Sequence, residues 1–600
     1  MTRAASARPR TLARLVAALR DRGLDPSEAL TSIAHVVADR CAPGVDLHGA
    51  GALLDGSIPF QALTGVDIPD ELIRPELLGD VLEQLHDRDA RRRQGSFFTP
   101  HVAAALVVER MTDGWPWPNR PRVCDPACGG GAFLLAAGRL LVEHGLRPAE
   151  IVSDLLWGID TDGVSVATTQ ATLALWAATH GDAAPVAHVV EGDALVAGVD
   201  CFGDEVELFD LVVGNPPFQS QLAASTARTR EQARVLEARF GSVSRAYADS
   251  STLFMVATAA MTRAGGRCAL ILPESFLAAR DAAPARAHLL DRGRLVGLWV
   301  PVDPMFSASV RVCVPILEVG SSADTTIRRW AGPTAMPAAE YRVDGRGLGV
   351  TWAELTADLL GVPSVDVPHD SALGSMAQAT AGFRDQFYGL QPFVRERNER
   401  DVDPVRLVTS GGIDLVNDLS SHRPTTFART TYTAPVVDME LLCREAPDLG
   451  RWAARVLVPK VMVATQTRVV EVLVDETGRD WPSVPVIAVI APAERLWHVA
   501  AVLASPPASA LGLRRHAGAA LTRDALKLSA KQVLALPLPA DAPAWDRGAD
   551  HLRSASMCAQ VRDGDGWARE LHAFGTAMCE AYGASNDVLD WWERRLTSLR

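Results

Sequence analysis

An apolar segment that ends in Asn-Pro-Pro-Phe places hydrogen-bond acceptors in a restricted turn. A strand is expected over Leu208–Val213, and it is followed by Asn215, Pro216, Pro217 and Phe218. Proline fixes the backbone φ angle and so restricts the turn. The Asn215 side-chain carbonyl and the Pro216 backbone carbonyl can accept both hydrogens of one exocyclic amine, while Phe218 can stack on its base. A plain turn is the alternative, which the position directly after a strand disfavours.

A second motif joins an acidic residue to a cluster of glycines. The segment Val123–Leu134 reads V-C-D-P-A-C-G-G-G-A-F-L, so a strand ending near Asp125 runs into a glycine turn and then a helix. Glycine permits tight backbone conformations and close approach of a ligand, and a helix N-terminus offers free N–H donors. This order is that of the first βα turn in a nucleotide-binding fold. A tight turn without a ligand is the alternative.

Further acidic residues follow the next two expected strands. Asp160 follows Trp157–Ile159 and can accept hydrogen bonds from the two ribose hydroxyls of a nucleoside such as S-adenosylmethionine. A helix N-cap is the alternative for both Asp160 and Asp162; we favour the ribose role for Asp160 and the cap for Asp162. Asp193 follows His188–Val190 and can accept from an adenine amino group, or serve as a plain turn residue.

Together these motifs resemble the gamma class of amino-methyltransferases that act on DNA adenine. The resemblance extends upstream to Gly95–Pro100 (G-S-F-F-T-P) and downstream to Gly265–Leu277 and to Phe306–Leu317, which resembles a final hairpin. Gly130 departs from the family, which often has serine there. The resemblance implies S-adenosylmethionine as cofactor, and double-stranded DNA with a flipped target adenine as substrate.

The resemblance also implies roles for individual residues. Seven residues around the first strand would bind the cofactor: Thr99, Pro100, Asp125, Pro126, Ala127, Gly129 and Gly131. Of these, Thr99 and Pro100 would touch its methionine end, and Asp125, Gly129 and Gly131 would shape the methionine pocket. Asp160 would bind ribose, and Asp193 with Phe133 would contact the cofactor adenine. The target amine would be held by Asn215, Pro216, Pro217 and Phe218. No general base would be needed to ionise the amine beforehand, and positioning supplies much of the rate of such an in-line displacement.

The elements that position these residues alternate helix and strand between Glu76 and about residue 320. Strands are predicted at Arg122–Cys124, Trp157–Ile159, His188–Val190, Leu208–Val213, Cys268–Leu272 and Leu295–Val300. This alternation indicates a doubly wound α/β sheet. The predicted fold is a Rossmann-like S-adenosylmethionine-dependent methyltransferase domain over 76–320. A helical segment 1–75 precedes it, and a mixed α+β target-recognition domain 321–540 and a helical region 541–600 follow.

Residues 321–540 resemble, more weakly, the target-recognition domains of type I and type IIG-like methyltransferases. The similarity lies in Ala381–Tyr388, Arg455–Val461, Leu503–Pro506 and Leu534–Pro539. The basic residues expected to contact DNA are Arg384, Lys460, Arg468, Arg514, Arg515 and Lys527. A solvated surface charge is the alternative for each of them.

Composition and missing motifs narrow the function classes further. The 600 residues are 48% hydrophobic and 22% charged, as in ordinary globular proteins, and the net charge of −13 disfavours simple coating of nucleic acid. The nine cysteines form no CxxC pair, so no metal site is expected. No membrane span or signal peptide is predicted, which places the chain in the cytoplasm.

The sequence has no Walker A motif and no readable nuclease pattern. It therefore predicts a modification enzyme, or the modification subunit of a restriction or phage-defence system whose nuclease or other subunits are separate. Two alternatives stay open. One is a methyltransferase acting on a protein glutamine or an RNA amine, and the other is a DNA-specificity scaffold that has lost activity.

Overall fold

The computed structural model describes most of the chain, which divides into two compact units, Met1–Val350 and Thr351–Arg600. The described residues are 3–47, 50–60, 63, 68–85, 99–181, 185–203, 206–218, 229–244, 249–301, 310–320, 326–343, 348, 351–367, 371–382, 384–421, 423–517 and 525–597. The predicted Gly95–Phe98 motif and Phe306 lie outside these residues.

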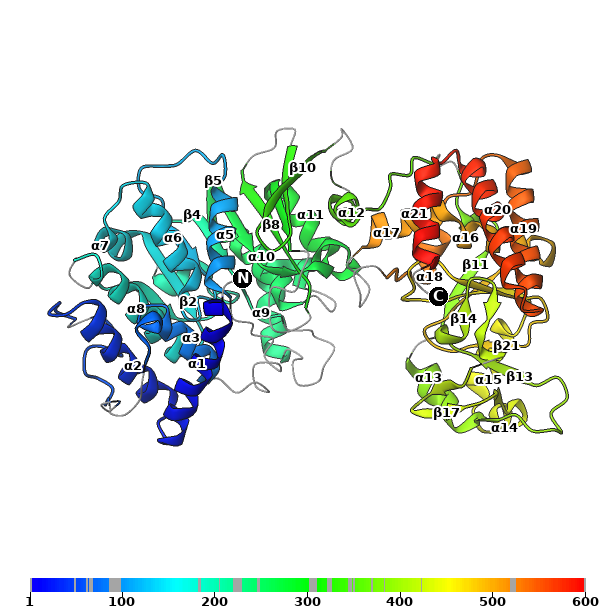
Figure 1. The fold of residues 1–600 in the computed structure, drawn as a ribbon, viewed down its shortest axis with the longest axis horizontal. Helices are drawn as coiled ribbons and strands as arrows, with labels where there is room; N and C mark the ends of the chain where they lie inside the picture. Colours follow the sequence, from blue (N-terminus) through cyan, green and yellow to red (C-terminus); the bar gives the residue numbers. More distant parts are fainter. Residues whose placement is uncertain are drawn as a thin grey trace. The chain divides into compact units, whose positions relative to one another are not determined.

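The first unit is built on one large sheet (Figure 1). Its strands run in the order β10-β9-β7-β8-β5-β4-β1-β2-β3, and β6 pairs with β8. The bounds are β1 Val123–Asp125, β2 Leu156–Asp160, β3 His188–Glu191, β4 Phe209–Gly214, β5 Thr262–Leu270, β6 Leu272–Pro273, β7 Gly293–Val300, β8 Val312–Val319, β9 Thr326–Ala331 and β10 Met336–Arg342. Strands β3, β2, β1, β4 and β5 are mutually parallel, and β8 is antiparallel between β5 and β7.

Helices cover this sheet in a doubly wound arrangement. Helices α5 (His101–Thr112), α6 (Ala132–Glu143) and α8 (Gly163–Ala178) share a hydrophobic core with the central strands. Helices α10 (Ser250–Met261) and α11 (Ala283–Arg292) pack on each other, with α10 against β4 and β5 and α11 against β7. Because βαβ crossovers are right-handed, the reversal of strand order after β3 places the later helices on the other face.

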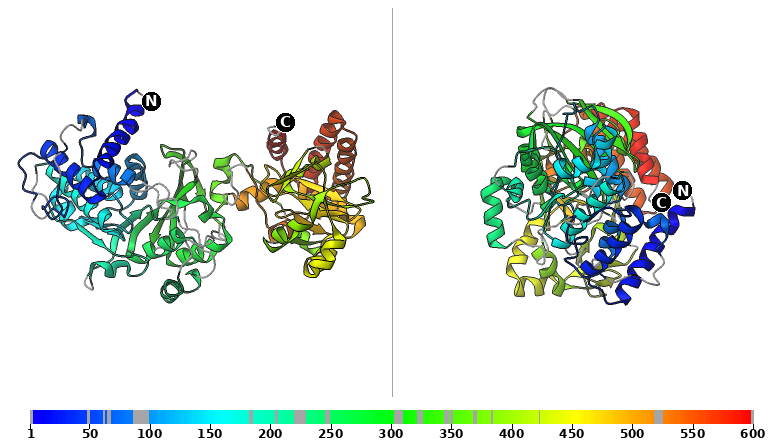
Figure 2. Two further views of the ribbon diagram at one scale, coloured as in Figure 1. Left: turned by 90° about the horizontal axis from the view of Figure 1, so that it is seen from below. Right: turned by 90° about the vertical axis from the view of Figure 1, so that its left-hand side faces the viewer.

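Other helices of this unit lie outside these layers. They are α1 (Arg3–Asp21), α2 (Pro26–Cys41), α3 (Leu77–Leu85), α7 (Pro148–Glu150) and α9 (Arg230–Phe240). Asp25 caps α2 with a full capping box, which satisfies otherwise unpaired backbone donors. The first three helices, blue in Figures 1 and 2, bury Leu19, Leu30 and Ile33 in a second core shared with α8. The N-terminal helices thus brace the helix that follows β2.

The second unit contains two four-stranded sheets, each with a main hydrophobic core, and a smaller core joins residues of both. One sheet has the order β11-β22-β19-β20 and the other β12-β18-β13-β21. Their bounds are β11 Gln378–Ala381, β22 Ile487–Ile490, β19 Lys460–Val463, β20 Val472–Asp475, β12 Val394–Glu396, β18 Pro435–Val437, β13 Val405–Val408 and β21 Asp480–Pro482. The remaining strands form two small hairpins. One pairs β14 (Ile413–Asp414) with β15 (Asn417–Asp418), and the other pairs β16 (Thr425–Phe427) with β17 (Thr430–Tyr432).

Helices of the second unit divide between the two sheets. The first sheet packs with α16 (Leu496–Ala504), α17 (Pro506–His516), α18 (Ala530–Leu534), α19 (Ala542–Gln560), α20 (Gly564–Tyr582) and α21 (Asn586–Thr597). The second packs with α13 (Arg384–Leu390), α14 (Met439–Glu445) and α15 (Pro447–Val456) around Trp452 and Trp481. A short helix, α12 (Glu354–Ala357), packs against α17.

The structure confirms the predicted fold class and the position of the predicted strands. Each strand predicted between residues 122 and 300 overlaps an observed one, with ends that differ by a few residues. Strands β9 and β10 carry the large sheet on to Arg342, past residue 320, because β9 pairs in parallel with β7. The four-part domain division stays a prediction. Among the described residues no single helix is long and apolar enough to cross a membrane. The bent helix pair Ala493–Ala504 and Pro506–His516 would be long and apolar enough, by length and composition only.

Candidate functional site

The candidate site lies where strand order reverses, between β1 and β4. The sheet runs from β1 outward to β2 and β3 on one side and to β4 and β5 on the other, with all five strands parallel. Ligands of open α/β sheets bind in the crevice outside the carboxyl ends of strands at such a switch point. The three predicted motifs follow the carboxyl ends of β1, β2 and β4, so the topology brings them to the same edge.

The glycine turn after β1 depends on backbone conformations that glycine adopts without strain. Gly129 has φ +51° and Gly131 has φ +82°, both in the left-handed region. Gly131 is the N-cap of α6. A Cβ atom on Gly131 would lie 3.1 Å from Cγ2 of Thr169, so the turn also approaches α8 closely. The turn therefore directs the N-terminus of α6 toward the carboxyl edge of the sheet, as the sequence predicted.

Asp125 ends β1 as a buried carboxyl group. It is 1% exposed, and its Oδ1 accepts a hydrogen bond from the Ala127 backbone N–H at 3.0 Å. Its Oδ2 is buried without a hydrogen-bond partner in the part of the chain that the structure describes. Burial, together with the nearby Asp160 charge, raises the pKa of Asp125 to about 8. This carboxyl group suits a cationic ligand, which would favour its ionised form.

Asp160 and Asp162 make different contacts, and one of the two predicted roles, the helix cap, can be seen directly. Asp162 is the N-cap of α8, accepting from the Ser165 backbone N–H, so the predicted cap is confirmed. Asp160 accepts from the Gly129 N–H at 2.9 Å and the Asp162 N–H at 3.0 Å. Burial raises the pKa of Asp160. Asp160 therefore joins the glycine turn to the end of β2, and ribose binding stays a prediction.

The two residues predicted to contact the cofactor adenine lie in different surroundings. Asp193 is exposed, and its Oδ1 accepts from the Leu195 N–H at 2.9 Å, which is the turn role weighed as the alternative. Phe133 is 3% exposed and packs in the core with α5 and α8. The structure thus gives Asp193 a turn contact and Phe133 a packing contact, and their adenine contacts stay predictions.

Asn215 is oriented by a residue more than a hundred positions away in the sequence. Its Nδ2 donates to Oγ1 of Thr99 at 3.1 Å, and Thr99 is 6% exposed. Because the amide is planar, this bond turns Nδ2 toward Thr99 and Oδ1 to the opposite side. Pro216 is buried, and Phe218 is half-buried against the core. The structure therefore brings Thr99 and Asn215, predicted in separate roles, into one contact.

Sequence reasoning missed two residues that shape this edge. Thr169 on α8 donates from Oγ1 to the Gly129 carbonyl at 2.6 Å and so holds the glycine turn. Gly214 ends β4 where a Cβ atom would lie 2.5 Å from Oδ1 of Asp125. Thr169 carries no local signal because its partner is 40 residues away. Gly214 had one, since a glycine inside a strand pattern marks a close approach.

The residues predicted to contact DNA do not share one environment in the second unit. The prediction that Lys460 contacts DNA is wrong, because Lys460 is completely buried in β19. Its Nζ donates to Oδ2 of Asp475 at 2.5 Å. Burial lowers the pKa of Lys460, while Asp475 opposes that shift. The sequence indicated a surface charge because unpaired lysine is almost never fully buried, and Asp475 is a tertiary partner.

The other basic candidates are partly exposed or lie outside the described residues. Arg514 donates to the Val362 carbonyl at 3.2 Å, a contact within its own unit. Arg468 and Lys527 lie on neighbouring segments, joined by the bridge between Thr467 and Leu526. Lys527 is exposed, Arg468 and Arg515 are half-buried, and the Arg384 side chain lies outside the described residues. DNA contact by these residues stays a prediction.

The strand order and the motif positions define the class of the first unit. A parallel β3-β2-β1-β4-β5 arrangement extended by an antiparallel β8 and by β7, with a glycine turn after β1, is a Rossmann-like fold. Residues 74–328 match the family described as N-6 DNA Methylase. The match confirms the resemblance that the sequence motifs indicated for this region.

Individual relatives agree with this family. The type II methyltransferase M.VspI of Vibrio sp. (strain 343) is 29% identical over 101 residues, which are 17% of this chain and 22% of the relative. The type I restriction enzyme HindI methylase subunit of Haemophilus influenzae (strain ATCC 51907 / DSM 11121 / KW20 / Rd) is 34% identical over 79 residues, 13% and 17% of the two chains. The matched segments thus span about a fifth of these relatives' lengths.

A solved structure shares the fold over most of the chain. It is the type IIL restriction-modification enzyme MmeI in complex with DNA, at a TM-score of 0.58 and 14% sequence identity. The alignment covers 88% of this chain and 82% of that chain. At this identity the likeness concerns the fold alone.

Proposed function

We propose that the protein is a site-specific DNA methyltransferase that uses S-adenosylmethionine to methylate N6 of adenine. The observation that carries the proposal is the Asn215 amide, which Thr99 orients at the carboxyl end of β4. Strand β4 pairs with β1, which ends in the buried Asp125. The family match over residues 74–328 supports the same reaction.

The residues at the end of β1 and β2 fit the proposed cofactor. S-adenosylmethionine, when bound, supplies an electrophilic methyl group and carries positive charge on its sulfonium and ammonium groups. The buried Oδ2 atom of Asp125, which has no hydrogen-bond partner among the described residues, suits a cationic N–H donor. Asp160, together with Asp193 and Phe133, would hold the nucleoside, and the glycine turn would let the backbone approach the ligand.

Asn215 and Pro216 would hold the target amine. The Oδ1 atom of Asn215 and the carbonyl of Pro216 accept the two amine hydrogens and fix the nitrogen lone pair in one direction. Phe218 stacks on the base, which must leave the duplex to enter the site. Thr99 sets the plane of the Asn215 amide, so this acceptor is oriented before the substrate binds. Pre-organisation of this kind supplies much of the rate.

We further propose that the second unit binds the DNA and that the chain serves a restriction-modification or phage-defence system, with nuclease activity supplied by a separate subunit. The likeness in fold to MmeI, a restriction-modification enzyme solved in complex with DNA, supports the proposed DNA binding. The test is expression in a bacterial host that lacks its own adenine methylation, followed by long-read sequencing of the genomic DNA. N6-methyladenine at one recurrent motif is the expected result. Unmodified DNA, from a protein that binds the cofactor, would favour a glutamine or RNA amine as substrate.

A further inference from the structure

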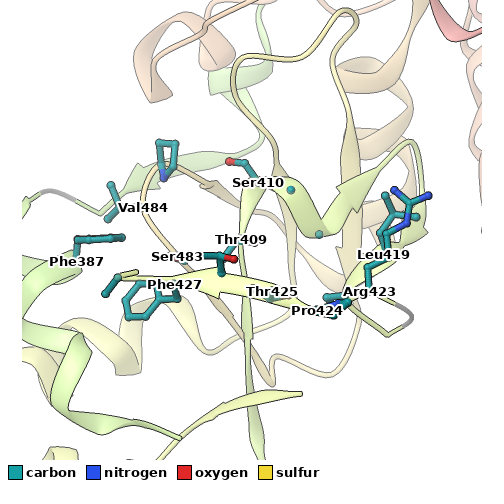
Figure 3. Close-up of a pocket in the computed structure, with 16 residues that line it drawn as sticks. Phe387, Thr409, Ser410, Leu419, Arg423, Pro424, Thr425, Phe427, Ser483 and Val484 are labelled. Atoms are coloured by element: carbon teal, nitrogen blue, oxygen red, sulfur yellow. The ribbon is translucent and has the colours of Figure 1, made fainter. Parts of the chain in front are cut away.

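A pocket in the second unit carries hydroxyl groups and a cation but no acidic residue. It encloses about 370 Å³ beside the β16–β17 hairpin. Figure 3 shows Phe387, Phe427 and Val484 at one end and Arg423 with Leu419 at the other. Thr409 and Ser483 lie between the two ends. The lining is thus aromatic on one side, cationic on the other and hydroxylic in the middle.

Two of the hydroxyl groups are buried without a hydrogen-bond partner. Ser483 is 2% exposed, and neither its Oγ nor that of Ser410 has a partner among the described residues. A buried hydroxyl without a partner costs free energy, so a ligand with acceptor atoms would relieve this cost. Gly411 follows Ser410 in the lining, and a Cβ atom there would meet nothing within 4 Å, which leaves the backbone accessible.

The pocket continues into a second one across Arg423. The second pocket encloses about 610 Å³ and shares Leu419 and Arg423 with the first. It adds Arg562 and Trp567, and its single acidic residue, Asp563, is the N-cap of α20. In the described part of the chain no carboxylate forms an ion pair with Arg423. The groove is therefore locally positive in a chain of net charge −13.

We propose that these two pockets, from here on called the Arg423 groove, bind the backbone of the DNA substrate, with a phosphate at Arg423. This inference rests on the proposed function, which makes DNA the substrate. Arginine, serine and threonine side chains are the usual partners of phosphate oxygens. In this arrangement the hydroxyl groups of Ser410 and Ser483 donate to the DNA backbone. Phe387 and Phe427, at the aromatic end of the groove, contact the adjoining sugar and base.

The test measures binding of a fluorescently labelled duplex of mixed sequence by the full-length protein over a series of salt concentrations. Arg423→Ala is expected to weaken binding and to lower the slope of log affinity against log salt by about 1, as loss of one phosphate contact does. Arg495→Ala is the matched control, because Arg495 is also exposed in this unit but lies outside the groove. Ser483→Ala is expected to weaken binding without lowering the melting temperature, since the hydroxyl has no partner to lose.

The outcomes separate the groove from the proposed function. If the wild-type protein methylates DNA and Arg423→Ala retains the wild-type affinity and salt slope, the proposed DNA binding by the Arg423 groove is contradicted. The proposed function is then unaffected. If Arg423→Ala loses affinity and slope while the wild-type protein methylates no DNA, the groove is supported and the reaction is wrong. A wild-type protein that does not bind the duplex at all would overturn both.

Discussion

The candidate site of the first unit and the predicted DNA contacts of the second differ in how well the sequence indicated the role of a charged residue. In the first unit the acidic residues of the candidate site, Asp125 and Asp160, are the last residues of β1 and β2, near the switch point of the sheet. In the second unit Lys460, a charge of the kind that suggests DNA contact, is completely buried and paired with Asp475. Position in a regular fold thus indicates the role of a charge, whereas charge alone does not.

Replacement of Asn215 is expected to have the largest effect. Asn215→Ala removes one of the two acceptors for the target amine and should lower methylation by at least about 100-fold, as misplacement of a reacting group does. DNA binding, cofactor binding and the melting temperature should stay at wild-type values. The measurement is transfer of labelled methyl groups to DNA by the purified protein. Full activity of this variant would remove the central residue from the mechanism.

Replacement of Lys460 tests the second half of the comparison. Lys460→Met leaves Asp475 buried without its cation and should cost about 3–5 kcal/mol in the free energy of unfolding. Urea unfolding of the full-length protein provides the measurement. Lys527→Met is the control, because Lys527 is exposed and most surface substitutions change stability by about 0.5 kcal/mol or less. Unchanged stability with weakened DNA binding would restore Lys460 as a DNA contact.

The neighbouring residues Asp160 and Asp162 provide a matched pair in the first unit. Asp160→Ala should raise the Kd for S-adenosylmethionine by about 10- to 150-fold, the range for hydrogen bonds to a charged group. Asp162→Ala should cost about 1 kcal/mol of stability through loss of a helix cap, with the Kd unchanged. Calorimetric titration measures both Kd values. Equal losses of affinity in the two variants would contradict the division of roles.

Each unit also contains a buried carboxyl group whose pKa is raised to about 8, Asp125 in the first and Glu471 in the second. The folded protein keeps these protons between about pH 4 and pH 8, where the unfolded chain has lost them. Stability should therefore fall as the pH rises through this window, and level off above it. Asp125→Asn and Glu471→Gln should each reduce this slope, which unfolding experiments across the window would measure.

Asp125 and Glu471 also allow the proposed cofactor contact to be distinguished from a carboxyl group that is merely buried. A cationic cofactor favours ionised Asp125, so cofactor affinity should rise with pH up to about pH 8. Asp125→Asn should remove this rise. Glu471→Gln should retain it, because Glu471 lies in the other unit. A cofactor affinity that does not change with pH in the wild-type protein would contradict the assignment of Asp125.

The sequence predicted the fold of the first unit well, because the strands and turns that form its candidate site follow local patterns. The glycine turn, the Asn-Pro-Pro-Phe turn and the strands that precede them are short and contiguous, and the parallel topology then places them at one edge. The Thr99–Asn215 bond and the packing of Thr169 on the turn were not predictable. Each joins residues far apart in the sequence, and a hydroxyl side chain gives no local sign of its partner.

The second unit shows the limit of the same reasoning. The predicted DNA contacts of this unit rest only on the positive charge of arginine and lysine. Charge alone does not distinguish an exposed phosphate contact from a buried ion pair. Lys460 is buried because β19 lies between β20 and β22, a strand order that local patterns do not encode. Arg423 was not among the predicted residues, and the phosphate contact proposed for it rests on two adjoining pockets that no local pattern shows.

The most direct test of the central claim is nucleoside analysis of DNA treated with the purified protein and S-adenosylmethionine. The protein should produce N6-methyldeoxyadenosine, and Asn215→Ala should not. The appearance of N4-methyldeoxycytidine would show that the protein methylates an exocyclic amine of DNA, but it would contradict adenine as the target. Unmodified DNA, from a protein that binds both cofactor and duplex, would contradict the proposed reaction.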